Sequence, residues 1–391
     1  MARGPVPSQG ASREQLSHLL ATPYLQGYRR AEDRPTVLFH DRAAVHSGLN
    51  LYISGHAAEA FLTDMDGRVL HRWAYPLRRL WPDLYQADPE VAKLEYWRRA
   101  YLYPNGDLLA IYEGLGLVKL DRRSNVLWAH RGGIHHDLFV TGDGRIHVLD
   151  RDGKVLPRLR RNGPVLEDFV TVLSPDGRVV ERLSLLESFE RSQFAPLLRF
   201  MPDKKPDLFH TNTLEVLDGR FADRDPAFRA GNLLLSVLQL DALAIVDPEQ
   251  QKVVWARRGG WRKQHQPTVL DNGRLLLFDN LGAGADRSRV IEIDPSSGAI
   301  GWQFGGNSET DLFSKTLGSA ERLANGNTLI TESENGRALE VTPDGRVVWE
   351  FYNPQRAGAR GELVAVLFEV VRLPADFPFR GEADARGTIP P

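Results

Sequence analysis

The sequence predicts an all-β protein, a six-bladed β-propeller with short helical insertions. One phrase recurs six times: a short apolar strand, an Asp- or Gly-rich turn, and a second strand that usually ends in Trp. A second recurrent element, a hairpin with an Asx-Gly or Gly turn, precedes each copy. Repetition at a roughly fixed period is the signature of a repeat architecture. One element of each kind makes a sheet of about four strands, which is the size of one propeller blade.

The six copies of the phrase occupy 62–73, 119–130, 173–183, 245–257, 292–304 and 340–351. Their landmark residues Trp73, Trp128, Leu183, Trp255, Trp302 and Trp349 are 55, 55, 72, 47 and 47 residues apart, which fits blades with insertions. The preceding hairpins are 103–113, 140–150, 214–240, 270–280 and 323–333, with a degenerate first copy at 46–56. Asx-Gly supplies the positive φ of tight hairpin turns. We interpret the Trp residues as packing between blades rather than as substrate platforms.

The intervals between repeats predict three helical segments. Residues 184–209 have the Leu and Phe spacing of a short amphipathic helix and are expected to form an inserted flap. Residues 78–99 and 13–25 also have a helical pattern. We therefore expect a polar or helical extension over 1–45, the propeller over 46–372 and a tail over 373–391. The alternative folds are a β-sandwich and a generic α+β protein, which the regular paired turns disfavour.

The composition excludes several classes of function. The formal net charge is −2 and no basic stripe stands out, so nucleic acid is not an expected partner. The chain has no Cys, which excludes disulfides, thiolate metal sites and a thiol nucleophile. No apolar run reaches the length of a transmembrane helix, and the first fifteen residues lack the apolar core of a secretory signal.

Position within the repeat selects candidate functional residues. The innermost strands of a propeller line its central channel, so equivalent positions in different blades face one another. Counting back from the Asx-Gly turns, seven residues in most blades and eight in the longest, gives Arg98, His136, His210, His265 and Gly318, with Ser319 beside the last. The alternative for each histidine is a structural imidazole bonded to a backbone carbonyl. For Arg98 the alternative is an ion pair with an acid such as Asp83.

Three imidazoles and a guanidinium at one level suit two chemistries. One is a transition-metal site, because neutral imidazole is the commonest ligand for such metals. The other is an anion site that holds a sulfuryl or phosphoryl group in transfer, with one imidazole as the nucleophile. Asn212 is a poor metal ligand but a good donor to an anionic oxygen, which favours the anion site and predicts no metal. Asp137 is interpreted either as orienting His136 or as capping a turn.

Around these residues the sequence resembles the bacterial arylsulfotransferase (arylsulfate sulfotransferase) family. The most specific stretches are HHDLF (135–139), FHTNT (209–213), QHQPTVLDNGRLLLFDN (264–280) and GSAERLANGNTLITES (318–333). The resemblance implies a six-bladed propeller whose channel moves a sulfuryl group from a phenolic sulfate ester to a phenol by a ping-pong route. It also implies an N-sulfo histidine intermediate, no cofactor, no PAPS, and a periplasmic or membrane-tethered location. The chain has no G-x-x-x-x-G-K-[ST] loop for a nucleotide phosphate.

The resemblance assigns roles residue by residue. His265 is the implied nucleophile, and His210 with Asn212 matches a His-x-Asn pair that contacts the sulfate oxygens and serves proton transfer. His136 helps to form the anion pocket, and His135, Arg98 and Ser319 are the further substrate-binding candidates. The family's usual Ser-x-Arg is absent, since Leu238 stands where that Arg is expected. Arg98, on another blade, is then the candidate source of the missing charge.

Two other functions remain open at this point. One is a propeller without catalysis that binds a small anion or a protein partner, which Leu238 favours. The other is a metal-dependent hydrolase or lyase that uses the same ring of histidines.

Overall fold

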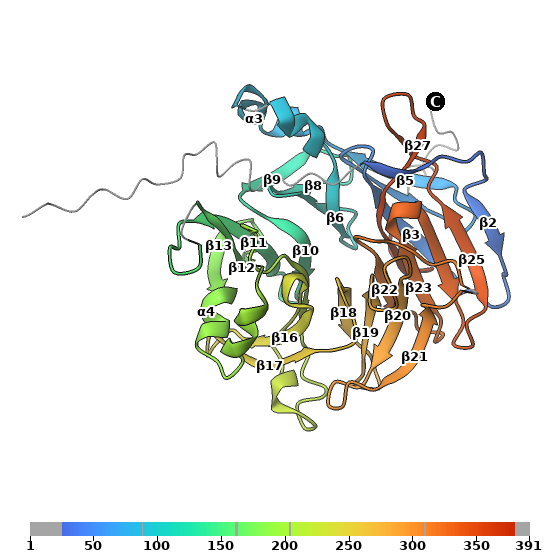
Figure 1. Ribbon diagram of the computed structural model, residues 1–391. Coiled ribbons are helices and arrows are strands. Elements are labelled where there is room, and N and C mark those ends of the chain that lie inside the picture. The colour runs from blue at the N-terminus through green and yellow to red at the C-terminus, as the bar shows by residue number, and fades with distance from the viewer. Residues whose placement is uncertain (1–25, 88, 161–162, 203–204, 309, 380–391) are drawn as a thin grey trace, which may run out of the picture.

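The structure is a computed structural model that describes residues 26–87, 89–160, 163–202, 205–308 and 310–379. These residues form an all-β structure, which confirms the predicted class, and most strands belong to four-stranded antiparallel sheets (Figure 1). The first sheet contains β3 (Gly48–Ser54), β4 (Glu59–Thr63), β5 (Val69–Ala74) and, from the C-terminal end of the chain, β28 (Leu367–Pro374).

The other large sheets use consecutive strands. The second and third contain β6 (Trp97–Leu102), β7 (Leu108–Tyr112), β8 (Gly116–Leu120) and β9 (Val126–Arg131), then β10 (His135–Val140), β11 (Ile146–Lys154), β12 (Val165–Leu173) and β13 (Val179–Ser184). The fourth and fifth contain β14 (Thr211–Val216), β15 (Leu233–Val237), β16 (Ala242–Asp247) and β17 (Lys252–Arg258), then β18 (His265–Val269), β19 (Leu275–Asp279), β20 (Arg289–Ile293) and β21 (Ile300–Gly305). The sixth contains β22 (Ser319–Arg322), β23 (Thr328–Glu332), β24 (Arg337–Val341) and β25 (Val347–Tyr352), with β2 (Val37–His40) at its outer edge.

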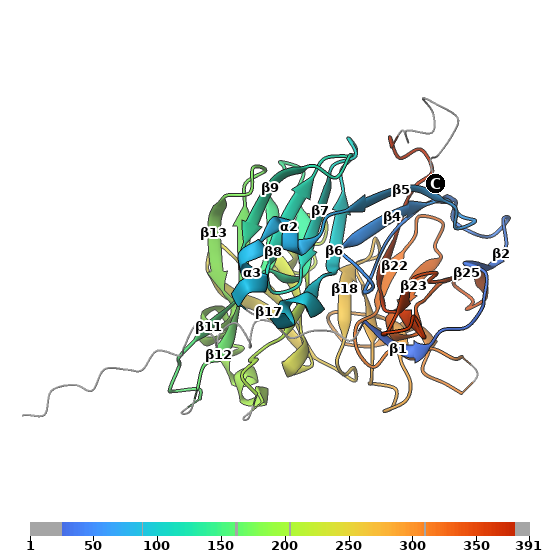
Figure 2. The same ribbon diagram turned by 90° about the horizontal axis from the view of Figure 1, so that it is seen from above.

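The sheets follow one another around a common centre. Strand β6 contacts β3 and β10, β14 contacts β10 and β18, and β22 contacts β18. Strand β23 contacts β28, so the last sheet meets the first (Figures 1 and 2). Each copy of the repeated phrase forms the last two strands before the next sheet begins. The arrangement is propeller-like, and it explains the degenerate first copy, because β28 supplies the strand that this copy lacks.

The repeated Trp residues connect neighbouring sheets. The indole N–H of Trp73 donates to the Gly106 carbonyl of the second sheet (3.2 Å), and that of Trp128 donates to Pro175 in the third (3.1 Å). Trp302 donates likewise to Pro343 (2.8 Å). An indole has one polar atom on a large apolar ring, so it packs between sheets while its N–H caps a turn of the next one. Packing between repeats is therefore their role in the structure.

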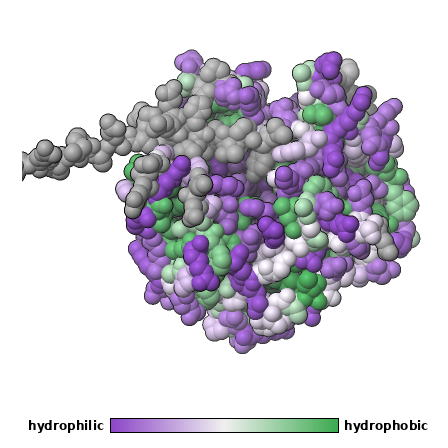
Figure 3. All heavy atoms as spheres, in the orientation of Figure 1, coloured by the Kyte–Doolittle hydropathy of each residue, from purple (hydrophilic) through white to green (hydrophobic). Residues whose placement is uncertain are grey.

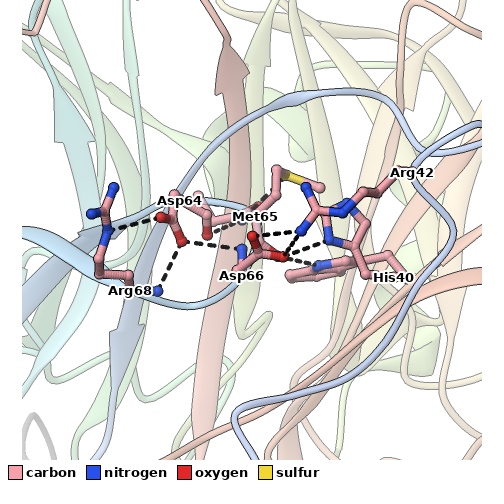
Figure 4. Close-up of polar contacts among 8 residues, drawn as sticks. His40, Arg42, Asp64, Met65, Asp66 and Arg68 are labelled. Atoms are coloured by element: carbon pink, nitrogen blue, oxygen red, sulfur yellow. Dashed lines mark hydrogen bonds and ion pairs between the residues drawn. The ribbon is translucent and has the colours of Figure 1, made fainter.

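The junction between the last and first sheets has an exposed and a buried part. On the exposed side, Asp66 in the β4–β5 turn accepts hydrogen bonds from His40 (2.8 Å) and Arg42 (2.8 and 2.9 Å), as Figure 4 shows. In the interior, Arg372 on β28 donates to Glu340 on β24 (2.8 Å), and both side chains are fully buried. The junction is thus held by the same kinds of polar contact at two depths.

The helical insertions are short. They comprise α2 (Leu77–Leu80), α3 (Pro82–Ala87) and the 3₁₀ segment η1 (Pro89–Leu94) beside the second sheet, and α4 (Leu185–Glu190) with η2 (Ala195–Phe200) after the third (Figure 2). Further 3₁₀ turns are η3 (Pro226–Phe228), η4 (Leu238–Leu240) and η5 (Ser333–Asn335). The predicted helix over 78–99 is wrong at its end, because Trp97 is buried and begins β6. The predicted helix over 13–25 lies outside the described residues.

The ends of the predicted propeller also differ in detail. Within the expected polar or helical extension, residues 26–45 contain β2 and β1 (Gly27–Arg30), and β1 forms a small sheet with β27 (Leu363–Ala365) and β26 (Arg356–Ala357). In the expected tail, Phe379 packs edge-on against Trp73. The face seen in Figure 3 is mainly hydrophilic, with hydrophobic side chains in separate small groups. In the part of the chain that the structure describes, no helix is long and apolar enough to cross a membrane.

Candidate functional site: a polar cavity among the inner strands

A β-bulge near the start of the inner strand brings the candidate residues to one place. The register of β6, β10, β14, β18 and β28 shifts within their first few residues. The residues inside these bulges include Arg98, His136, Asp137, Asn212, Gln266 and Phe368, and all six line one cavity. A bulge leaves residues out of the regular ladder and re-aims their side chains. The repeated bulge therefore turns these side chains toward the centre.

The cavity is partly open to solvent and is completed by Arg99, Thr213, His265 and Gly318. Of the residues predicted from the sequence, Arg98, His136, Asn212 and His265 line it. His210 lies beside it, with its ring centroid 4.8 Å from that of His136. His135 lies behind His136, and Ser319 pairs with Thr331 in the sheet while Gly318 faces the cavity. His135 and Ser319 are therefore not among the residues that line the cavity, whereas their neighbours His136 and Gly318 are.

The tautomer of His265 is fixed by its surroundings. Its Nδ1 lies 2.8 Å from Oδ1 of Asn280 and 3.0 Å from the Lys263 carbonyl, and both partners are acceptors. The Asn280 amide cannot be reversed, because its Nδ2 donates to the carbonyls of Ser314 (2.8 Å) and Leu317 (2.6 Å). Nδ1 must therefore carry the proton, which leaves the lone pair on Nε2. That is the tautomer a nucleophilic imidazole needs.

His265 also stays neutral. Burial lowers its pKa to about 3, and the nearby cations Arg98 and His210 act in the same direction, although the bond to Asn280 opposes them. An imidazole with this pKa keeps its lone pair throughout the physiological range. The same positive surroundings favour an anion in the cavity.

His210 has the opposite character. Burial would lower its pKa, but the Asp207 carboxylate, which is hydrogen-bonded to Nδ1, raises it above the ordinary value. The pKa of Asp207 is shifted in the opposite direction: burial would raise it, but the neighbouring His210 lowers it to about 2. The pair is thus an imidazolium held by a carboxylate. It provides a positive charge and a proton donor next to His136.

Two arginines and an amide complete the polar lining. Arg99 is held by Asp137 (2.9 Å) and Glu369, and Arg98 lies with its guanidinium carbon 5.2 Å from the Phe368 ring centroid. Asp83, the alternative partner for Arg98, pairs instead with Arg131 (2.5 Å). The side-chain amide of Asn212 donates one N–H hydrogen bond to the Gln264 carbonyl (2.9 Å). An amide has two such hydrogens, so one remains for a ligand.

The structure bears on two sequence interpretations. Asp137 does more than cap a turn, since it accepts from the N–H groups of Leu138 and Leu214 (both 2.9 Å) and pairs with Arg99. Leu238 is buried at the start of η4 and is not among the cavity-lining residues. Two residues that line the cavity, Arg99 and Gln266, were not predicted from the sequence. Only their positions directly after Arg98 and His265 could have indicated them. Three further residues lie against the histidines from other strands or loops: Asn280 contacts His265, Asp207 contacts His210 and Asp168 faces His135. Their positions in the repeat do not match those of the histidines, so spacing along the sequence could not have identified them.

One group of residues has the composition of a metal site. Glu113, His135 and His136 are buried, with their potential ligand atoms within 4.8 Å of one another. The two Nδ1 atoms, however, face each other at 2.7 Å, which is the distance of a shared proton. The Arg151 guanidinium also lies 3.8 Å from Glu113 and supplies positive charge there. The donor set fits a hydrogen-bonded network better than a cation.

The fold and this cavity define an all-β, propeller-like protein with a polar cavity among its inner strands, lined by imidazole, guanidinium and amide groups. The sequence model of the arylsulfotransferase (ASST) family matches residues 102–354, and the chain belongs to that family. The match includes His136, His210, Asn212 and His265 but begins after Arg98. It supports a sulfotransferase-like function in general terms.

Comparison with other proteins adds information on the fold. No curated protein sequence matches the chain. A protein of unknown function from Bacteroides caccae is similar in structure, with a TM-score of 0.54, 13% identity, and coverage of 83% of this chain and 98% of that one. A streptogramin B lyase (TM-score 0.47, 11% identity, 90% and 98% coverage) and the WD40 β-propeller domain of Doa1 (0.45, 11%, 90% and 96%) also match.

Proposed function

We propose that the chain is a six-bladed β-propeller and that its central cavity transfers a sulfuryl group from an aryl sulfate ester to a phenol, without PAPS. The observation that carries the proposal is the neutral His265, whose Nε2 lone pair faces a cavity lined by Arg98, His136 and Asn212. A neutral nucleophile surrounded by cationic and N–H donors suits attack on the sulfur of an anionic ester. The family supports the same reaction class.

The reaction has two half-reactions. The lone pair of His265 Nε2 forms a bond to sulfur as the bond between sulfur and the aryl oxygen breaks, and the phenolate takes a proton from His210. In the second half, the acceptor phenol returns its proton to His210 as its oxygen attacks sulfur, which frees His265. Arg98, His136 and Asn212 hold the sulfuryl oxygens during both steps. Fixed donors of this kind each contribute about 3–4 kcal/mol to stabilising the transition state.

The direct test uses the full chain and needs no variant. We expect p-nitrophenyl sulfate with a phenolic acceptor to give p-nitrophenol and the aryl sulfate of the acceptor. Without acceptor, intact mass spectrometry should show one SO₃ adduct that disappears when acceptor is added. Ligand binding without adduct or turnover across a panel of aryl sulfates would leave the non-catalytic anion-binding protein as the function.

The Arg98→Met variant tests where the charge missing at Leu238 comes from. Methionine keeps most of the side-chain length but removes the guanidinium, so we expect kcat for aryl sulfate to fall by about 10²–10³-fold. Arg98→Lys should recover part of this loss, because lysine restores the charge without the two-pronged geometry. Steady-state kinetics measure both variants. Unchanged kcat in Arg98→Met would assign the charge to another residue.

The pH dependence follows from the opposite shifts of two pKa values. His265, with a pKa of about 3, is neutral above about pH 4, so the first half-reaction should show no acid limb. The pKa of His210 is raised, so its proton is present at neutral pH and is lost only as pH rises through that higher value. Single-turnover rates should therefore fall on the alkaline side. The fall should be steep for weakly acidic phenols and shallow for p-nitrophenol, which needs little protonation.

Asp207→Asn provides the matched comparison for this profile. Removal of the carboxylate should lower the pKa of His210, because burial is then opposed only by the smaller effect of Asp168, and should move the alkaline limb to lower pH. An alkaline limb that stays in place in Asp207→Asn would show that His210 is not the proton donor.

A further inference from the structure

A second layer of polar groups lies behind the cavity. His135 Nδ1 contacts His136 Nδ1 at 2.7 Å, and on its other side His135 Nε2 lies 4.0 Å from Oδ1 of Asp168 on β12. His135 and Asp168 are each only 1% exposed. Within the described ranges, neither His135 Nε2 nor Asp168 Oδ1 has a hydrogen-bond partner. Two such atoms at this separation are within reach of one bridging water or of a small shift into direct contact.

The contact between the two imidazoles links their tautomers. Burial, reinforced by the positive charges of Arg151 and His210, holds the pKa of both His135 and His136 well below the usual range and keeps both neutral, although Asp207 and the Asp150 backbone act in the opposite sense at His135. Two neutral rings that meet through Nδ1 can place only one proton between them. If His135 carries it, His136 has its own proton on Nε2. If His136 carries it, His136 Nε2 has a lone pair and His135 has its proton on Nε2.

We propose that Asp168, acting through His135, decides whether His136 presents an N–H or a lone pair to the cavity. A protonated Asp168 donates toward His135 Nε2, which places the proton of His135 on Nδ1 and that of His136 on Nε2. An ionised Asp168 accepts from His135 Nε2 and reverses both tautomers. Only the first state offers a donor to an anionic oxygen. Asp168 and His135 are thus positioning residues, and the proposal rests on the proposed function only in taking that oxygen to be sulfuryl.

The surroundings of Asp168 allow both states near neutral pH. Burial and the charge of Asp207 raise its pKa to about 7, while the Thr211 N–H, which donates to Oδ2 (2.7 Å), and His210 act against them.

His136 is faced by Glu113, whose Oε1 lies 3.4 Å from its Nδ1 and favours the lone-pair state. Arg98, Arg151 and His210 face it as cations. Below about pH 7 the donor state should therefore prevail, and above it the lone-pair state.

The test observes the tautomer directly. Long-range ¹H–¹⁵N correlation spectra of the full chain labelled at histidine, recorded from about pH 5.5 to about pH 8.5, identify the protonated nitrogen of each ring. The His136 signals are assigned by their loss in His136→Gln. In the wild-type protein we expect the proton of His136 to move from Nε2 to Nδ1 as pH rises through about 7. A single tautomer over the whole range would overturn the proposal without the need for any variant.

Asp168→Asn gives the sharper comparison. The Thr211 N–H must still be accepted, so the amide oxygen takes that place and the NH₂ group faces His135 as a permanent donor. His136 should then keep its proton on Nε2 at every pH. Asp150→Asn, which changes another buried carboxylate of the same sheet, should retain the wild-type transition. A transition that persists in Asp168→Asn would contradict the role of Asp168.

Binding of inorganic sulfate, measured by calorimetry, supplies a second readout that does not depend on turnover. Wild-type affinity should fall by about tenfold more between the two pH limits than the affinity of Asp168→Asn, which corresponds to one hydrogen bond to a charged ligand. If sulfuryl transfer occurs but His136 keeps one tautomer at every pH, the role of Asp168 is contradicted and the proposed function stands. A tautomer change without transfer from any donor would defeat the proposed function and leave this proposal standing.

Discussion

His265→Ala should abolish the SO₃ adduct and lower sulfuryl transfer by about 10⁴-fold or more, because loss of a covalent nucleophile removes the reaction path rather than one contact to the transition state. Intact mass after incubation with p-nitrophenyl sulfate measures the first effect, and initial rates measure the second. Added imidazole should restore part of the rate, since it can occupy the space that alanine leaves and offer the same lone pair. Rescue of this kind is not expected for a residue with a structural role.

His130→Ala is the matched control for this experiment. His130 is a partly buried imidazole on β9, bonded to the Gly177 carbonyl (3.2 Å) and absent from the cavity lining. The adduct and the rate should be close to those of the wild-type protein. An adduct that survives in His265→Ala, or one that is lost in His130→Ala, would remove His265 from the role of nucleophile.

Glu340→Gln should lower the stability of the fold by about 3–5 kcal/mol, because it leaves the fully buried Arg372 without its counter-charge. Glu340 also accepts from Asn327 (2.7 Å) and from the His46 N–H (2.6 Å), and Arg372 donates to Asn50 (2.8 Å). The bonds from Arg372 and His46 to Glu340 join the first sheet to the last, and the other two hold these side chains within their own sheets. Urea or thermal unfolding, followed by circular dichroism, measures the loss.

Two further variants test whether the loss of stability arises because the Glu340–Arg372 pair is buried or because it lies at the junction between the two sheets. Glu340→Gln combined with Arg372→Met removes both charges and should recover part of the lost stability. Asp66→Asn changes the exposed contacts at the same junction (Figure 4) and should cost less than about 1 kcal/mol. Equal losses in Asp66→Asn and Glu340→Gln would show that the buried pair has no special part in joining the two sheets.

The sequence predicted the strands well because their signal is local. Each copy of the repeated phrase needs only an alternating or apolar run and a turn with positive φ, and both are visible within a dozen residues. Strand β28 was harder to predict, since its place beside β3 depends on closure of the whole chain. The helix predicted to reach residue 99 overran β6 for a related reason. Burial of Trp97 between sheets outweighed the helical spacing.

The count from the Asx-Gly turns also worked only in part. It led to Arg98, His136 and His265 in the cavity. In the structure, however, His265 pairs in the ladder with Phe278, as His135 pairs with Leu149, whereas His136 lies inside the bulge. Seven residues before the turn therefore correspond to a residue inside the bulge in β10 and to a paired residue before the bulge in β18, because the two bulges differ in size. Bulge size depends on contacts between strands and is invisible in a linear count.

The sequence by itself determined the repeat, the all-β class, the family and four of the side chains that line the cavity, Arg98, His136, Asn212 and His265, since each depends on residue type and spacing along the chain. Only the tertiary structure decided what those side chains can do. Two imidazoles of the same chemistry became a neutral ring with a free lone pair at His265 and a cation at His210, because Asn280 faces one and Asp207 the other. Protonation depends on neighbours in space, on burial and on the direction of hydrogen bonds, and folding alone supplies these.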